Sequence, residues 1–110
     1  MKLRRFLILA TLVASCAHAA YVGTTMTKVA LVSSYNQYGS GDVLFKVENP
    51  ILECIDGYWL TKTDSGYQAN VVMIITAFQA KTPVVVFGLS DQLWSGSGGK
   101  YCKLYSFDLR

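Results

Sequence analysis

Two groups of aromatic and polar residues have the chemistry of a sugar-binding site. One group lies in a turn-rich segment and comprises Tyr35, Tyr38 and Asp42. The other lies near the C-terminus and comprises Asp91, Trp94 and Ser95. Sugars stack their apolar faces on aromatic rings, while carboxylates and amides bind the sugar hydroxyls. Each group is therefore a candidate ligand site, with the alternative that the loop tryptophan covers the core.

The titratable residues predict neither an enzyme nor a metal site. The single histidine is His18, close to the N-terminus. Without it, the remaining chain has no Ser-His-Asp or Cys-His nucleophile and no zinc site of the usual histidine type. Asp64 is better explained as a helix cap, and Asp56 as a turn residue before Gly57. We therefore expect no catalytic residue, no cofactor and no metal.

The first nineteen residues have the order of an export signal. Lys2, Arg4 and Arg5 precede an apolar run from Phe6 to Ala14, and Ala17-His18-Ala19 resembles a cleavage site. The apolar run is far shorter than the roughly 20 residues that span a membrane, and no later segment comes closer. We expect a signal peptide at residues 1–19, a single domain at 20–110 and no transmembrane segment. The mature protein would be secreted or periplasmic.

The same segment also fits a lipoprotein signal. Val13-Ala14-Ser15-Cys16 resembles the lipobox, in which the cysteine is acylated and becomes the new N-terminus. The alternative to secretion is therefore an outer-membrane lipoprotein anchored through Cys16. Simple cleavage is the favoured interpretation.

The positive net charge of the chain belongs to the signal. Lys2, Arg4 and Arg5 are three of the ten basic residues, so seven remain against seven acidic ones. The mature chain is formally neutral. Its charge thus gives no reason to expect a nucleic acid or an anionic membrane as partner.

Two cysteines remain after the signal, Cys54 and Cys102. In an exported chain such a pair is expected to form a disulfide. A bridge that closes a loop of about 49 residues would stabilise the fold by about 4 kcal/mol in the chain-entropy model.

Three extended segments precede a helix, and two follow it. The strands are expected at Thr27–Tyr35, Val43–Glu48, Ile51–Lys62, Pro83–Leu89 and Lys100–Leu109, with side chains alternating between two faces. The third segment is either one bent strand or two short ones, Ile51–Ile55 and Tyr58–Lys62. The helix is expected from Asp64 to Lys81, capped by Asp64 and Ser65 and stopped before Pro83. This order, βββαββ, is that of the OB-fold, a five-stranded Greek-key barrel, in a mainly β protein with one helix.

The alternative fold is an all-β sandwich. Val71 to Thr76 is β-branched almost throughout and would then be a strand. As a helix, the stretch from Asp64 to Lys81 has two apolar faces, one of which contains Tyr67, Val71, Ile74, Ile75 and Phe78. The second face contains Val72, Met73 and Thr76. A five-stranded barrel leaves that second face without a partner, so we expect it to be an interface between copies of the chain.

From Cys54 to Trp94 the chain resembles the B subunits of subtilase cytotoxin and typhoid toxin. The shared pattern is a cysteine, a nearby tryptophan, an amphipathic helix, a polar stretch with proline before a valine-rich strand, and a second tryptophan. It is matched by Cys54, Trp59, the helix with Phe78 near its end, Lys81-Thr82-Pro83-Val84 and Trp94. In addition, Trp94-Ser95-Gly96-Ser97 and Tyr101-Cys102 are similar to the endings of short exported bacterial proteins of undescribed function.

The resemblance implies a ring of five OB-fold subunits that binds host glycans and carries a toxic A subunit. The family has a tyrosine in the strand after the helix, close to the position that Gly88 occupies in this chain, so no binding residue of the family is carried over. The leading hypothesis is an exported, homo-oligomeric binding module that recognises glycans or a protein surface. The alternative is a periplasmic or lipid-anchored envelope protein without a small-molecule ligand.

Overall fold

The computed structural model describes residues 21–110. The expected signal peptide, His18 and the alternative lipidation site Cys16 lie outside the described residues. Within the described part, six strands, one short 3-10 helix and one α-helix follow each other along the chain. Their bounds are β1 Tyr21–Gly23, β2 Val29–Ser34, β3 Val43–Val47, η1 Leu52–Cys54, β4 Gly57–Leu60, α1 Tyr67–Ala80, β5 Val84–Leu93 and β6 Tyr101–Leu109. The prediction of a mainly β protein with one helix is confirmed.

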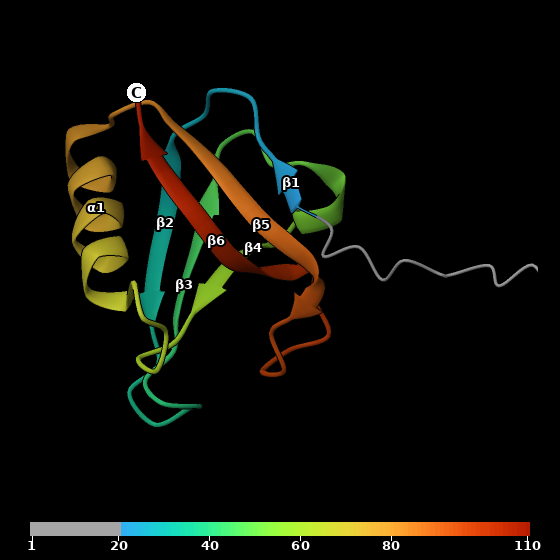
Figure 1. Cartoon of the computed structure of the whole chain (residues 1–110). Helices are drawn as coiled ribbons and strands as arrows, with labels where there is room; N and C mark the ends of the chain where they lie inside the picture. The colour runs from blue at the N-terminus through green and yellow to red at the C-terminus, as the bar shows by residue number, and fades with distance from the viewer. Residues whose placement is uncertain (1–20) are drawn as a thin grey trace, which may run out of the picture.

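The six strands form one mixed sheet in the order β1-β5-β6-β4-β3-β2 (Figure 1). The pair β4 and β6 is parallel, and every other pair is antiparallel. Between β1 and β2, Thr27 forms a bridge to Val84, with both backbone N–H groups bonded across at 2.9 and 2.8 Å. The short segment between β1 and β2 therefore connects the two outermost strands of the sheet and lies against the start of β5.

The core is built from residues that are far apart in the sequence. Phe45 of β3 and Tyr58 of β4 stack with ring centroids 5.1 Å apart, and both side chains are fully buried. Cys54 and Cys102 form the predicted disulfide, which joins η1 to β6 inside this core. The bridge thus fixes the irregular segment before β4 against the last strand.

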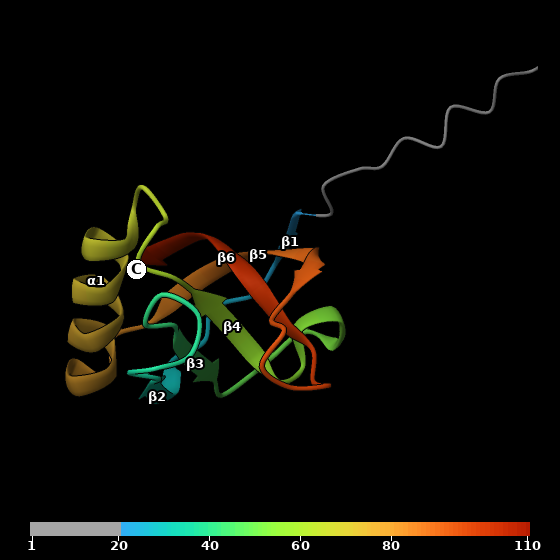
Figure 2. The same ribbon diagram turned by 90° about the horizontal axis from the view of Figure 1, so that it is seen from below.

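The helix lies beside the sheet and closes one end of the core (Figures 1 and 2). Ile74 and Ala77 are fully buried, and Tyr67, Val71 and Met73 pack against the core. The prediction that Ile75 and Phe78 also point inward is wrong, because both are exposed. The segment Val71 to Thr76, despite its β-branched residues, lies within α1. No helix among residues 21–110 is both long enough and apolar enough to cross a membrane.

The predicted helix cap is wrong. The helix has Gly66 as its N-cap, and no side chain bonds its first turn. The Asp64 carboxylate instead accepts a hydrogen bond from the backbone N–H of Thr61 at 2.8 Å and pairs with the Lys103 ammonium at 2.7 Å. The helix begins only at Tyr67, so the carboxylate stabilises the turn after β4 instead. The end of the helix is as expected: Lys81 adopts a left-handed conformation and Pro83 follows.

Two β-bulges break the predicted alternation of side chains. In β2 the register shifts between Val29 and Leu31, so Val29 is buried while Leu31 is exposed. In β6, Leu104 faces Gly88 and Ser106 faces Phe87, which leaves Tyr105 as the extra residue. A bulge adds one residue to one strand and reverses the inward and outward positions beyond it. Phe107 is for this reason buried, although strict alternation places it with the outward residues.

Gly88 lies where β5 passes closest to the core. A Cβ atom at this position would lie 2.8 Å from Cε1 of Tyr58 and 3.0 Å from Cβ of Cys102. A glycine inside this strand predicts a bulge or a close approach, and the structure has both at Gly88.

We expect Gly88→Ala to lower the free energy of unfolding by about 1–3 kcal/mol, because the added methyl group overpacks a core with no free space. The matched control is Gly98→Ala, since a Cβ atom there meets no other atom within 4 Å. Urea unfolding measures both variants. Equal stabilities of the two variants would contradict the tight packing of Tyr58 against β5.

Because Tyr58 is buried, the free energy of unfolding changes with pH in the alkaline range. Desolvation, with a smaller effect of the Glu53 charge, raises the pKa of Tyr58 to about 12, against 10.0 for an ordinary tyrosine. Between these values the unfolded chain releases the proton and the folded chain keeps it, so the stabilisation is complete below pH 10 and lost as pH rises towards 12. We expect an additional loss of about 2–3 kcal/mol over this range, which Tyr58→Phe abolishes. Urea unfolding at several pH values tests this, and identical profiles for both proteins would refute it.

Candidate functional site

The two predicted ligand groups meet in the structure. Tyr35, Tyr38 and Asp42 lie in the loop between β2 and β3, whereas Trp94 and Ser95 follow β5. The ring centroids of Tyr35 and Tyr38 lie 5.2 and 5.1 Å from that of Trp94, and the Tyr38 hydroxyl lies 2.9 Å from Ser95 Oγ. Figures 1 and 2 show both loops at the same end of the sheet. We call these five residues the two-hairpin cluster.

A buried hydrogen bond holds the two-hairpin cluster together. Nε1 of Trp94 donates to Oδ2 of Asp42 at 2.9 Å. Only 3% of Asp42 and 6% of Trp94 are exposed. The other carboxylate oxygen, Oδ1, accepts a hydrogen bond from the backbone N–H of Ser40 at 3.3 Å. Asp42 and Trp94 therefore lie beneath the surface and join the two hairpins.

Two glycines make room for this hydrogen bond. Gly39 has a positive φ of 61°, and a Cβ atom there would collide with the carboxylate of Asp42. A Cβ atom at Gly96 would collide with the Trp94 ring. At Gly39 both the positive φ and the close approach require glycine, and at Gly96 the close approach does. Both loop sequences therefore fit this contact.

The accessible part of the cluster consists of tyrosine rings. Tyr35 is 42% and Tyr38 is 38% exposed. Partly buried Tyr101 packs its ring 5.8 Å from that of Trp94, and the Lys46 ammonium lies 5.8 Å from the centroid of Tyr101. The surface thus offers ring faces, hydroxyls and one cation. This combination suits a ligand with both apolar faces and hydroxyl groups.

Asp91 does not belong to the two-hairpin cluster. It lies within β5, which continues to Leu93, and its side chain is exposed. In the register of the sheet, Tyr21 of β1 faces Leu89, two residues before Asp91. Asp91 therefore lies near the Tyr21 end of β1, on a different part of the surface.

A second polar contact was not predicted from the sequence. The Lys103 ammonium lies 4.0 Å from the centroid of the Trp59 ring while it pairs with Asp64. Nε1 of Trp59 donates to the carbonyl oxygen of Gln92 at 3.0 Å. Alternation along β4 places Trp59 on the face opposite buried Tyr58. The sequence holds no signal for its partners, because they lie about 30 or 40 residues further along the chain.

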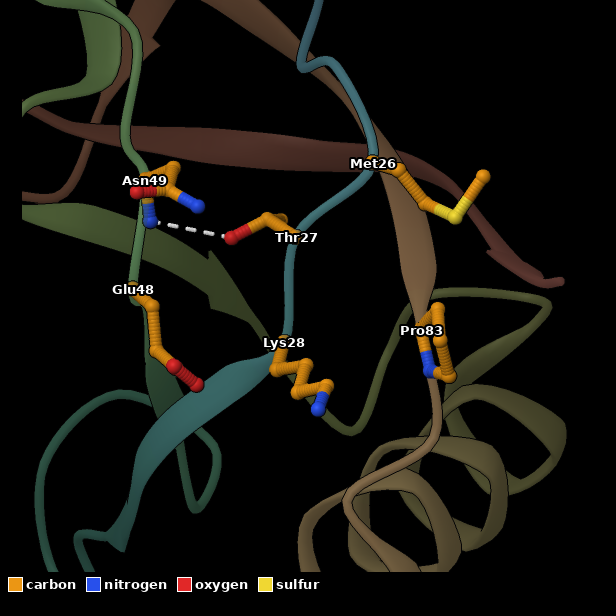
Figure 3. Close-up of a pocket in the computed structure, with 6 residues that line it drawn as sticks. All are labelled: Met26, Thr27, Lys28, Glu48, Asn49 and Pro83. Carbon is orange, nitrogen blue, oxygen red and sulfur yellow. Dashed lines mark hydrogen bonds between the residues drawn. The ribbon is translucent and has the colours of Figure 1, made fainter.

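One hollow of the surface, of about 300 Å³, includes Asp64 and is lined by Lys62, Asp64, Ser65, Tyr67 and Gln68. Two further hollows lie away from both groups. One, of about 230 Å³, is lined by Met26, Thr27, Lys28, Glu48, Asn49 and Pro83 (Figure 3). Here Thr27 Oγ1 accepts a hydrogen bond from the backbone N–H of Asn49 at 2.9 Å. A neighbouring groove shares Lys28 and Glu48 and extends to Phe78. Within residues 21–110, no three metal-binding side chains come together.

The predicted interface residues of the helix differ in exposure. Val72 is 64% exposed, and Thr76 is exposed with its hydroxyl donating to the carbonyl of Val72 at 2.7 Å. Met73 is partly buried and packs against the core. The exposed apolar side chains of α1 are Val72, Ile75 and Phe78.

Comparison of the chain with protein-family models, with curated proteins and with solved structures found no match.

Removing the Asp42 carboxylate should destabilise the protein by about 1–3 kcal/mol, because the buried N–H of Trp94 then loses its partner. We expect Asp42→Ala also to shift the Trp94 fluorescence to longer wavelength, measured with Trp59→Phe in the background. The control is Asp91→Ala, an exposed site at which a change within about 0.5 kcal/mol is expected. A wild-type spectrum and stability for Asp42→Ala would show that this bond does not join the hairpins.

Proposed function

We propose that this protein is an exported binding module with an OB-fold, which recognises glycans through the surface of the two-hairpin cluster. The single observation that carries this proposal is the buried bond between Trp94 and Asp42, which joins the two hairpin loops into one surface. The fold, the ligand class and the cellular location are supported by separate observations.

The sheet order supports the OB-fold. If β1 and β2 are the two halves of one bent first strand, the five strands follow the order expected for that barrel. The parallel pairing of β4 with β6, the helix between β4 and β5, and the Thr27–Val84 bridge agree with this assignment. In OB-folds, the loops between strands one and two and between strands four and five bind oligonucleotides and oligosaccharides. These are the loops that carry the two-hairpin cluster.

The surface chemistry favours a glycan over a nucleic acid. Exposed Tyr35 and Tyr38 offer rings and hydroxyls, and Lys46 is the cation next to Tyr101. Single-stranded nucleic acids are bound by grooves with many positive charges. From residue 21 on, seven basic residues face seven acidic ones. The Cys54–Cys102 disulfide supports an oxidising compartment, in agreement with the expected signal peptide.

Assembly of several copies is part of the proposal. The exposed apolar residues Val72, Ile75 and Phe78 support an interface along α1, with Thr76 beside them and Met73 at its margin. Five subunits and a toxic A subunit are proposed only on the resemblance to the toxin B subunits.

The buried positions of Asp42 and Trp94 favour a second candidate function. In an envelope protein without a small-molecule ligand, the contact between the hairpins would serve stability alone.

The test is a glycan array probed with the mature protein, followed by titration of the glycans that bind. We expect Tyr35→Ala and Tyr38→Ala to weaken binding about tenfold, because each removes an exposed ring. Lys28→Ala, an exposed site at the end of β2 opposite the two-hairpin cluster, should leave binding unchanged. Sedimentation of the wild type and of Val72→Glu tests assembly, with dissociation expected for the variant. A monomeric wild type without any glycan binding would favour the envelope protein.

A further inference from the structure

An exposed pair of tyrosines lies on the sheet outside the two-hairpin cluster. Tyr21 of β1 and Tyr105 of β6 have ring centroids 4.4 Å apart, with the ring planes at 65°. Each side chain is 56% exposed. Aromatic side chains in contact are usually buried, so an exposed pair of this kind suggests a ligand surface.

The pairing of both strands with β5, together with a bulge at Tyr105, places the two tyrosines together. The strands β1 and β6 both pair with β5, in which Leu89 faces Tyr21. Tyr105 is the extra residue of the bulge between β5 and β6. Bulges are frequent next to functional sites, where they redirect a side chain. Here the bulge directs Tyr105 to the exposed face, while Leu104 and Phe107 on either side remain buried.

A carboxylate accompanies the pair. Asp91 lies in a second irregular segment, between Leu89, which faces Lys103, and Leu93, which faces Cys102. Its side chain is exposed. Leu89 is the register partner of Tyr21, and Asp91 follows it by two residues. The pKa of Tyr21 is raised, first by the interaction with the Tyr105 side chain and least by the charge of Asp91. A carboxylate therefore lies near the exposed rings and their hydroxyls.

The arrangement of the rings distinguishes between two classes of ligand. A quaternary ammonium ion requires a cage of several ring faces. In this pair the rings meet edge to face, so the edge of one covers a face of the other. The free ring face suits the flat apolar side of a sugar, and the carboxylate and hydroxyls suit its hydroxyl groups.

We propose that Tyr21, Tyr105 and Asp91 form a second carbohydrate subsite, separate from the two-hairpin cluster. The inference deepens the proposed function, and it rests on that function for the ligand class alone. Two sites on one module would allow a branched or repeated glycan to bind with greater avidity than either site provides.

The test is an NMR titration of the isotope-labelled mature protein with methyl glycosides and lactose, followed by tetramethylammonium as the cationic probe. We expect sugar-dependent shifts at Tyr21, Asp91 and Tyr105. Tyr105→Ala and Asp91→Asn should each weaken the affinity measured from these shifts about tenfold. Tyr105→Phe, which keeps the ring, should reduce the affinity less than Tyr105→Ala does. Tyr35→Ala should leave the shifts at Tyr21, Asp91 and Tyr105 unchanged. Dispersed amide spectra of the variants confirm that each remains folded.

The results separate this inference from the proposed function. Shifts confined to Tyr35 and Tyr38 would overturn the second subsite and leave the proposed function intact. Shifts confined to Tyr21 and Tyr105 would support the subsite and remove the two-hairpin cluster from the proposed function. Shifts in neither region would overturn both. Tighter binding of tetramethylammonium than of any sugar would overturn the assignment of the ligand class.

Discussion

The packing around Tyr58 is the constraint on which the rest of the structure depends. Its ring stacks on Phe45 of β3 and lies against Gly88 of β5, and its backbone pairs with Cys102 of β6, so four strands meet at this residue. The strand β4 that carries it is short and pairs in parallel with β6. Because the disulfide fixes the residues just before β4 to β6, the ring has little freedom to move. Aromatic packing and a covalent bond together define the centre of a small domain, where hydrophobic burial alone stabilises weakly.

This constraint also shapes the surface. With Tyr58 inside, neighbouring Trp59 lies outside, where it packs against Lys103 and bonds to the backbone of Gln92. Close approach at Gly88 coincides with the bulge in β6 that exposes Tyr105. The surface features proposed for binding are therefore consequences of how the core is packed, since each irregularity lies beside a residue that the core fixes in place.

Much of the architecture could be predicted from local patterns. The helix, the hairpin of β2 and β3, the buried face of β3 and the disulfide follow from periodicity, turn residues and cysteine count. The actual role of Asp64 could not be predicted. Its carboxylate pairs with Lys103, about 40 residues away, and does not cap the helix. The bulges at Ala30 and Tyr105 could not be predicted from the sequence either. A single inserted residue leaves the composition of a strand unchanged while it reverses which side chains are buried.

The sequence by itself determined which residues have binding chemistry and which strands and helix carry them. How these residues combine depends on the tertiary structure, which joins Asp42 to Trp94 beneath the surface and leaves Asp91 within β5, outside that contact. The physical reason is the range of the interactions. Propensity and periodicity act over a few residues, whereas the pairing of β5 with β1 and the contact between the two hairpins join residues 50 or more positions apart. Such contacts depend on the whole sheet, and no local pattern in the chain encodes them.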